Sequence, residues 1–167
     1  MFIIFMGVSG CGKTTVGKMT AEVLGFPYYE GDDFHPPENV AKMAMGIPLT
    51  DEDRAGWLET LSSLIRQKLD DGESGVLSCS ALKQKYRDQL SVDPDRVHFI
   101  YLKGSYELIR ARMEERTGHY MPPELLKSQF EALEEPKNMF TICIDQSPTG
   151  ILQQVLVFLA DLGFETN

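Results

Sequence analysis

The stretch that decides the fold reads GVSGCGKT, residues 7–14, and it follows the apolar run FIIFM at residues 2–6. It fits the pattern G-x-x-x-x-G-K-[ST] at every fixed position. Glycines in such a loop let successive backbone N–H groups point at a phosphate, and the N-terminus of the next helix adds a partial positive charge. The pattern places the Lys13 ammonium at the β- and γ-phosphates and the Thr14 hydroxyl on Mg²⁺. We therefore expect a site for a nucleoside triphosphate and magnesium.

Other apolar runs follow along the chain and alternate with helical patterns. Short uninterrupted runs are typical of parallel strands that are covered on both faces. Beyond the first, they recur at residues 26–29, 75–79, 97–102 and 140–144. Apolar residues at helical spacing lie between or after them, notably over 57–69 and 151–162. This alternation implies right-handed crossovers, and we expect an α/β fold of three layers with about five parallel strands and helices on both faces.

Three helix boundaries carry recognisable signals. Thr50, with Asp53 three residues later, indicates an N-cap in front of the first of these two helices. Ser147 followed by Pro148 indicates the N-terminus of the last helix. Gly25 is expected to end the helix that begins in the phosphate loop.

The composition limits the class of protein. The chain has 167 residues, which fits one domain, and 43% of them are hydrophobic, which is typical of a globular protein. It carries 16 Lys+Arg against 25 Asp+Glu, a formal net charge of −9. This acidic balance argues against nucleic acid or an anionic membrane as the main partner. An anionic ligand would need a local cluster of cations.

The sequence shows no sign of export. The apolar opening at residues 1–6 is too short to span a bilayer, and no charged segment precedes it as in a signal peptide. The three cysteines, Cys11, Cys79 and Cys143, are widely spaced and odd in number, which indicates reduced thiols. We therefore expect a cytoplasmic protein.

Among proteins with this kind of loop, a compact small-molecule kinase fits best. A GTPase requires an Asn-Lys-x-Asp motif for guanine, and the sequence has none. The segment DRAG at 53–56 matches D-x-x-G, but it belongs to the capped helix rather than to the end of a strand. The length also leaves little room for the additional strands of most motor ATPases.

A kinase of this kind needs an acidic group near the acceptor hydroxyl. The weak second strand is followed by EGDDFH at residues 30–35, at the edge where ligands bind in an open parallel sheet. Alternation puts Glu30 and Asp32 on one side, so that one can support Mg²⁺ and the other can accept the hydroxyl proton. A solvated acidic turn is the simpler alternative for this segment.

Cations follow the third strand in the segment SCSALKQKYR, residues 78–87. If a helix begins near Ala81, Lys83 and Arg87 lie four residues apart on one face, which suits an anionic acceptor. Arg87 can then hold a carboxylate through two hydrogen bonds. A solvated helix face explains the same pattern equally well.

Arg110, Arg112 and Arg116 form a third group of cations, and GHYMPP at residues 118–123 follows them. The glycine interrupts the helix and the two prolines begin the next one. We expect a short helical lid here that closes over ATP and brings an arginine to the γ-phosphate. His119 is either a contact of this lid or an ordinary exposed histidine.

Taken together, the motifs resemble those of gluconokinases of the small P-loop type, within the group of nucleoside-monophosphate and shikimate kinases. The resemblance covers essentially the whole chain. It is carried by MGVSGCGKT (6–14), GDDFHP (31–36), GIPLTDEDR (46–54), CSALK (79–83), GHYM (118–121) and QFE (129–131). The phosphate loop alone is generic, but this ordered set of segments is specific.

The resemblance implies transfer of the γ-phosphoryl group of ATP, with Mg²⁺, to the 6-hydroxyl of D-gluconate. The catalytic residues would be Lys13, Arg116 and Asp32, which orients and deprotonates the hydroxyl. Nucleotide contacts would come from Gly7, Ser9, Gly10, Cys11, Gly12, Lys13, Thr14, Thr15, Arg112 and Arg116, and the metal ligand would be Thr14. Gluconate would be held by Asp32, His35, Arg54, Lys83, Arg87 and His119.

The resemblance also implies the layout of the chain. Residues 1–167 would form one kinase domain, with the phosphate loop at 7–14, an acceptor-binding region at about 32–90 and the lid at about 112–123. A homodimer is expected, with no nucleic acid or membrane as partner. Glu30 stands where the family often has Asp, and this departure leaves its support of the metal open.

Two other functions stay open at this point. One is a kinase for shikimate or for a nucleoside monophosphate, which residues 32–87 would distinguish. The other is a non-catalytic module that uses ATP only to close its lid, and the intact Lys13, Thr14 and Asp32 argue against it. A kinase of nucleic-acid ends conflicts with the net charge of −9.

Overall fold

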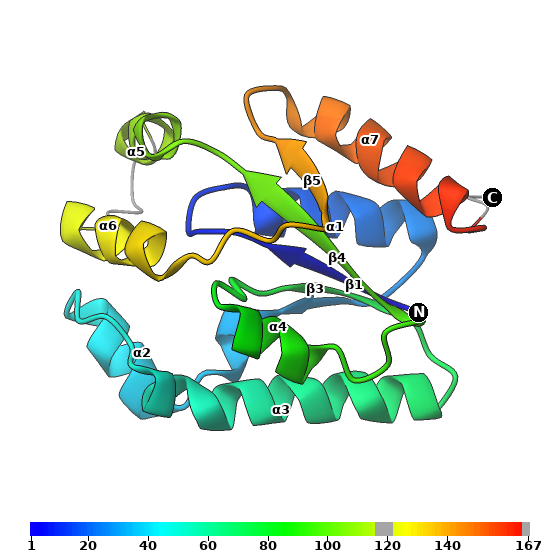
Figure 1. Ribbon diagram of the computed structural model, residues 1–167, viewed down its shortest axis with the longest axis horizontal. Helices are drawn as coiled ribbons and strands as arrows, with labels where there is room; N and C mark the ends of the chain where they lie inside the picture. Colours follow the sequence, from blue (N-terminus) through cyan, green and yellow to red (C-terminus); the bar gives the residue numbers. More distant parts are fainter. Residues whose placement is uncertain (116–121, 165–167) are drawn as a thin grey trace.

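A parallel sheet of five strands forms the centre of the protein (Figure 1). The computed structural model describes residues 1–115 and 122–164. The strands are β1 (Phe2–Met6), β2 (Tyr28–Glu30), β3 (Gly75–Ser78), β4 (Val97–Lys103) and β5 (Phe140–Cys143). Their order across the sheet is β2-β3-β1-β4-β5, and each neighbouring pair is parallel. The strand that leads into the phosphate loop is therefore the central one.

Helices cover both faces of this sheet (Figure 1). One face carries α1 (Lys13–Leu24) and α7 (Pro148–Asp161), and the other carries α3 (Asp51–Asp70) and α4 (Gln84–Leu90). Toward the carboxyl ends of the strands lie α2 (Pro37–Ala44), α5 (Tyr106–Glu115) and α6 (Pro123–Ala132). The expected α/β fold of three layers is confirmed. Within the described ranges, no helix has the length and the apolar character needed to cross a membrane.

The sequence of the central strand β1 is apolar without interruption because both faces of the strand are covered. Phe2, Ile4 and Met6 pack on the side of α3, whereas Ile3 and Phe5 pack on the side of α1 and α7. All five side chains are fully buried. A strand in the middle of a covered sheet has no solvent-facing side, so its sequence does not alternate. Burial of each such side chain contributes about 1.5–3 kcal/mol.

The predicted helix boundaries are confirmed. The Thr50 hydroxyl accepts a hydrogen bond from the backbone N–H of Asp53 at 3.1 Å, and the Asp53 carboxylate accepts one from the backbone N–H of Thr50 at 2.9 Å. At the start of α7, the Ser147 hydroxyl accepts from the backbone N–H of Gly150 at 3.2 Å. Gly25 ends α1 in the left-handed conformation, with φ 65°.

The segment after β3 differs from the expectation. A helix from Ala81 would place Lys83 and Arg87 on one face, but α4 begins only at Gln84, with Lys83 as its N-cap residue. Ala81 has φ 43° and is the one non-glycine residue with positive φ in the described part of the chain. This left-handed conformation is incompatible with a helix, so α4 starts later. The prediction that Lys83 and Arg87 share a helical face is therefore wrong.

Candidate active site at the carboxyl edge of the sheet

The phosphate loop follows β1 directly and is shaped by its glycines. Gly7 has φ 143°, and a Cβ built on it would lie 2.7 Å from Cys11 Sγ and 2.8 Å from the carbonyl oxygen of Leu102. No larger residue fits there without a shift of the loop. Gly12, with φ 97°, is the N-cap residue of α1. The loop therefore runs straight into the N-terminus of a helix, which is the geometry of an anion site.

Lys13 lies folded against its own loop. Its ammonium donates hydrogen bonds to the carbonyl oxygens of Gly7 and Val8, both at 2.9 Å, and lies 3.9 Å from Cys11 Sγ. A phosphate in the loop would offer this cation a charged acceptor, which is stronger than either carbonyl oxygen. The lysine is thus positioned to exchange its backbone partners for a bound anion.

Glu30, at the end of β2, lies beside the predicted metal ligand. The Thr14 hydroxyl donates a hydrogen bond to Glu30 Oε2 at 2.6 Å, and the Tyr28 hydroxyl donates to the same oxygen at 2.7 Å. Burial, together with the hydrogen bond to Glu30, raises the pKa of Tyr28, so its phenol stays protonated as a donor. Mg²⁺ at a phosphate site takes only one or two ligands from the protein. Thr14 and Glu30 therefore fit a magnesium ion that accompanies a nucleotide.

After β2, a short 3-10 turn, η1 (Gly31–Phe34), carries the predicted base. The Asp32 carboxylate is exposed and lines the cleft described below. The next side chain in the cleft, the His35 ring, is only 3% exposed and stacks on Trp57 with the ring centroids 4.1 Å apart. The Trp57 indole N–H in turn donates to the carbonyl oxygen of Gly31 at 2.7 Å. In this way α3 holds η1 in place.

The partners of the His35 ring fix where its proton lies. Asn39 Nδ2 donates to the backbone carbonyl oxygen of Asp53 at 2.8 Å, which identifies this atom as the amide nitrogen. The same nitrogen lies 3.2 Å from His35 Nδ1, so Nδ1 accepts and the proton is on Nε2. That Nε2 atom lies 3.8 Å from Asp32 Oδ1. Burial, and secondly the Arg54 guanidinium, lowers the pKa of His35 to about 4, so the ring is neutral at pH 7.

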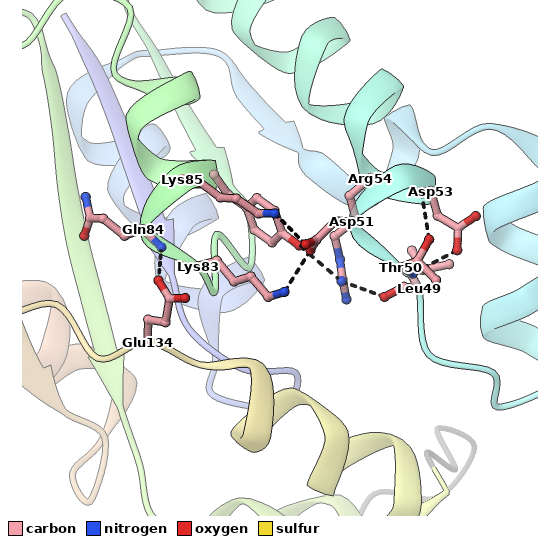
Figure 2. A network of polar contacts seen from close by, with 10 residues as sticks. Leu49, Thr50, Asp51, Asp53, Arg54, Lys83, Gln84, Lys85 and Glu134 are labelled. Carbon is pink, nitrogen blue, oxygen red and sulfur yellow. Dashed lines mark hydrogen bonds and ion pairs between the residues drawn. The ribbon is translucent and has the colours of Figure 1, made fainter.

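A network of cations surrounds Asp51 at the start of α3 (Figure 2). Its carboxylate accepts hydrogen bonds from Lys83 at 2.8 Å, from Lys85 at 2.5 Å and from the Tyr86 hydroxyl. These hydrogen bonds hold the pKa of Asp51 well below its usual range. The Arg54 guanidinium lies 5.7 Å from the centroid of the same Tyr86 ring. Three cations thus gather around the Asp51 carboxylate, at the start of a helix whose first turn also carries Glu52 and Asp53.

These features meet in one cleft at the carboxyl edge of the sheet. Its lining includes Ser9 and Lys13 from the phosphate loop, Glu30, Asp32 and His35 after β2, Arg54 and Trp57 from α3, and Leu125, Ser128 and Gln129 from α6. Figure 1 shows α2 and α6 on the same side of the molecule, beyond the ends of the strands. A phosphate-binding loop, a carboxylate and a guanidinium therefore share one site.

The predicted acceptor-binding residues do not all reach this cleft. Asp32, His35 and Arg54 line it together with Lys13. Lys83 is not part of the lining, and its ammonium pairs with Asp51. The structure thus brings Asp32, His35 and Arg54 together in the cleft and places Lys83 outside its lining.

Arg87 occupies a different place from the one expected. The residue is 3% exposed, and its guanidinium donates to the backbone carbonyl oxygens of Ala81, Leu82 and Glu134 at 2.8–3.0 Å. These hydrogen bonds tie the turn after β3 to the segment after α6. In this position the guanidinium binds backbone carbonyl oxygens, and Arg87 is not part of the lining of the cleft.

The structure describes some of the residues that were predicted to contact the nucleotide beyond Thr14. Arg112 lies in α5, and its guanidinium donates to the carbonyl oxygen of Ile144 at 2.5 Å. Thr15 is exposed in the first turn of α1. Arg116 and His119 lie outside the described residues.

Sequence reasoning missed three residues that shape the cleft. Helical spacing assigns Trp57 to the core, although its ring also stacks against the ring of His35. Asp51 looks like one more acid in the first turn of a helix, and Gln129 has no feature of its own in the pattern of α6. Gln129 nevertheless reaches the phosphate loop, where its Oε1 accepts from the backbone N–H of Ser9 at 2.7 Å. The only signal for Asp51 and Gln129 is that both lie in segments that carry the family resemblance.

The chain is similar to known proteins over most of its length. It matches the family model described as shikimate kinase over residues 9–155. It is 52% identical over 134 residues to the thermosensitive gluconokinase of Escherichia coli (strain K12), covering 80% of this chain and 72% of that protein. It is 41% identical over 158 residues to the gluconokinase of Gluconobacter oxydans, covering 93% of this chain and 89% of that protein. The crystal structure of a gluconokinase from Sinorhizobium meliloti matches it with a TM-score of 0.88 at 44% identity, covering 96% of this chain and 91% of that one.

Proposed function

The chain belongs to the shikimate kinase family, among its gluconokinases, and from this membership we propose that it phosphorylates D-gluconate at the 6-hydroxyl with ATP. The products are 6-phospho-D-gluconate and ADP. The observation that carries the proposal is the shared cleft, which Lys13, Asp32 and Arg54 line together. One site therefore combines a cation for the phosphates, a base for a hydroxyl and a cation for a carboxylate.

On the donor side, the Lys13 ammonium and backbone N–H groups of the phosphate loop bind the phosphates of ATP, whereas the N–H groups of Gly7 and Ser9 stay with Ser80 and Gln129. Thr14, with the support of Glu30, would hold the magnesium ion that accompanies ATP, and this ion would supply neutralisation of part of the phosphate charge. The hydrogen bond between these two side chains supports this role, because it already places their oxygens side by side. The family resemblance assigns Arg112 and Arg116 to contacts with ATP.

On the acceptor side, Asp32 orients the 6-hydroxyl and accepts its proton. His35, neutral and with its proton on Nε2, donates a hydrogen bond to a hydroxyl oxygen without adding charge. Arg54 binds the carboxylate, Lys83 contributes a second positive charge from its pair with Asp51, and the family resemblance also assigns His119 to this ligand. We assign Arg87 to the support of this region, because its donors are directed at backbone carbonyl oxygens.

The electrostatics of this region favour a sugar acid over a neutral sugar. We call Asp32, His35, Asp51, Arg54 and Lys83 the acceptor wall. The whole protein has a net charge of −9, yet within the acceptor wall the cations Arg54 and Lys83 balance the carboxylates of Asp32 and Asp51. A hydrogen bond between a guanidinium and a carboxylate contributes about 1.5–3 kcal/mol, which a neutral acceptor would not gain.

An assay of ADP release with Mg-ATP tests the proposal against its alternatives. D-gluconate, shikimate, AMP and CMP are compared in parallel, and turnover is expected with gluconate alone. Turnover with another acceptor would support the assignment as a kinase and overturn the assignment of gluconate as its substrate. Tight binding of ATP with no turnover of any acceptor would support a non-catalytic module instead.

The family resemblance also leads us to propose a homodimer that works in the cytoplasm. The three cysteines are unpaired, with Cys11 and Cys79 buried and Cys143 exposed, which agrees with a reducing compartment. Size-exclusion chromatography with light scattering tests the dimer, and a mass near 18.8 kDa would contradict it.

A further inference from the structure

One side chain connects α6 to the phosphate loop. Gln129 Oε1 accepts a hydrogen bond from the backbone N–H of Ser9 at 2.7 Å, across 120 residues of sequence. A backbone N–H can only donate, so the atom of the amide that faces it is the oxygen. The amide nitrogen, Nε2, is consequently the other terminal atom. Among the hydrogen bonds of the described residues, Nε2 takes part in none.

The position of this amide places it beside the reacting groups. Gln129 lines the cleft together with Lys13 of the phosphate loop and Asp32 of the acceptor wall. The phosphoryl group must pass between these two residues if ATP lies on the loop and the acceptor lies at Asp32. A donor on the wall of this passage faces the oxygens on which negative charge is spread during transfer.

We propose that Gln129 is a catalytic residue of the phosphoryl transfer, with Nε2 donating a hydrogen bond to a non-bridging oxygen of the γ-phosphoryl group. In this step the bond from the γ-phosphorus to the oxygen it shares with the β-phosphate breaks, and the bond to the acceptor oxygen forms. The proton of the acceptor hydroxyl passes to Asp32. The assignment rests on the proposed function, because it needs an acceptor at the acceptor wall.

The fold holds this donor in place before any ligand binds. The hydrogen bond to Ser9 fixes the plane of the Gln129 amide, and α6 itself is anchored by Leu125 and Leu126, which are 8% and 2% exposed. A donor that is already oriented toward developing charge stabilises the transition state more than the ground state. Its loss should therefore lower kcat and leave both KM values nearly unchanged.

The decisive variant is Gln129→Glu, which keeps an oxygen for Ser9 but replaces the donor with an acceptor. At pH 8 we expect kcat with gluconate to fall about 100-fold, as for other preorganised donors. Protonation of the new carboxyl group restores a donor, so the ratio of variant to parent kcat should rise as the pH falls from 8 to 6, by about threefold for a carboxyl group of ordinary pKa and by more if the neighbouring phosphates raise that pKa. Dividing by the parent at each pH removes the titration of Asp32. A residue that only ties α6 to the loop would give a flat ratio.

Two further variants keep the test independent of folding. Gln153→Glu makes the same change on the exposed surface of α7 and should stay within about twofold of the parent. Gln129→Met, which removes donor and acceptor at similar length, should lower kcat by a similar factor at every pH, and it replaces Gln129→Glu if that variant does not fold.

The outcomes separate this assignment from the proposed function. A parent that phosphorylates gluconate, with Gln129→Glu within twofold of its kcat or at a ratio independent of pH, would overturn the role of Gln129 alone. A parent that does not phosphorylate gluconate would overturn the proposed function and this assignment with it.

Discussion

In the phosphate loop, the groups that face a phosphate are backbone N–H groups, and glycines with positive φ such as Gly7 and Gly12 hold them. In the acceptor wall, the functional groups are side chains, and other side chains hold them. Asn39 orients His35, and Asp51 holds Lys83. The comparison indicates that phosphate binding is encoded locally by backbone conformation, whereas the choice of acceptor depends on contacts between distant parts of the chain.

The largest effect is expected from the cationic side chain of the phosphate loop. Lys13→Ala should lower kcat about 10³-fold, because the γ-phosphoryl group loses its closest cation. The KM for gluconate should change less than about threefold, since the acceptor wall is intact. Steady-state kinetics measure both, and Lys18→Ala, an exposed lysine on the same helix, is the control. An unchanged kcat with a raised KM for gluconate would place Lys13 on the acceptor side.

Asp32→Asn should produce the next largest effect. We expect kcat to fall about 100-fold, because the amide cannot accept the hydroxyl proton. The Kd for ATP, measured by calorimetry, should stay the same, since the loop does not depend on Asp32. Asp33→Asn is the matched control, because Asp33 is the exposed neighbour outside the cleft lining. Retained turnover in Asp32→Asn would refute its role as the base.

Arg54→Ala tests the acceptor wall in the same way. The KM for gluconate should rise about 10- to 100-fold through the loss of a charge-assisted hydrogen bond, and the KM for ATP should stay within about twofold. Arg66→Ala, further along α3 and exposed, controls for the loss of a cation from that helix. If the KM for ATP rose instead, Arg54 would belong to the nucleotide half of the site.

The strands, three of the helix boundaries and the phosphate loop could be predicted from the sequence, because each depends on residues that are close together along the chain. The buried faces of β1 require an uninterrupted apolar run, and the N-cap of α3 needs only Thr50 and Asp53, three residues apart. The phosphate loop is encoded by the conformation of its own glycines. These features depend on neighbours in sequence, so a pattern is enough to predict them.

The side chains in and around the cleft were harder to predict because their partners are remote. Arg87 binds the carbonyl oxygen of Glu134, 47 residues away, and Gln129 binds Ser9 across 120 residues. The left-handed conformation of Ala81 also shifts the start of α4 and separates Lys83 from Arg87. Spacing along a presumed helix carries no information about such contacts.

The smallest predicted effect concerns the burial of His35 in the acceptor wall. Its pKa is about 4 in the folded protein and about 6.5 in the unfolded chain, so the unfolded state binds more protons between these values. The free energy of unfolding should therefore fall as the pH falls through this window, by about 1 kcal/mol between pH 7.5 and 5.5. Urea denaturation of the parent and of His35→Gln measures this contribution, which the variant lacks. Equal pH dependence in both proteins would show that burial of His35 does not shift its pKa.

The order of the strands has a consequence for how such enzymes can diversify. The central strand β1 separates β2 and β3, which lead into the acceptor wall, from β4 and β5, which lead into the nucleotide side. The acceptor wall comes entirely from one continuous stretch between α1 and β4. A single recombination cassette spanning that stretch would therefore carry most of the acceptor preference, together with Glu30, while the phosphate loop and the segments from β4 onward are inherited unchanged. Evolution can exchange one substrate of such an enzyme without rebuilding the machinery for the other.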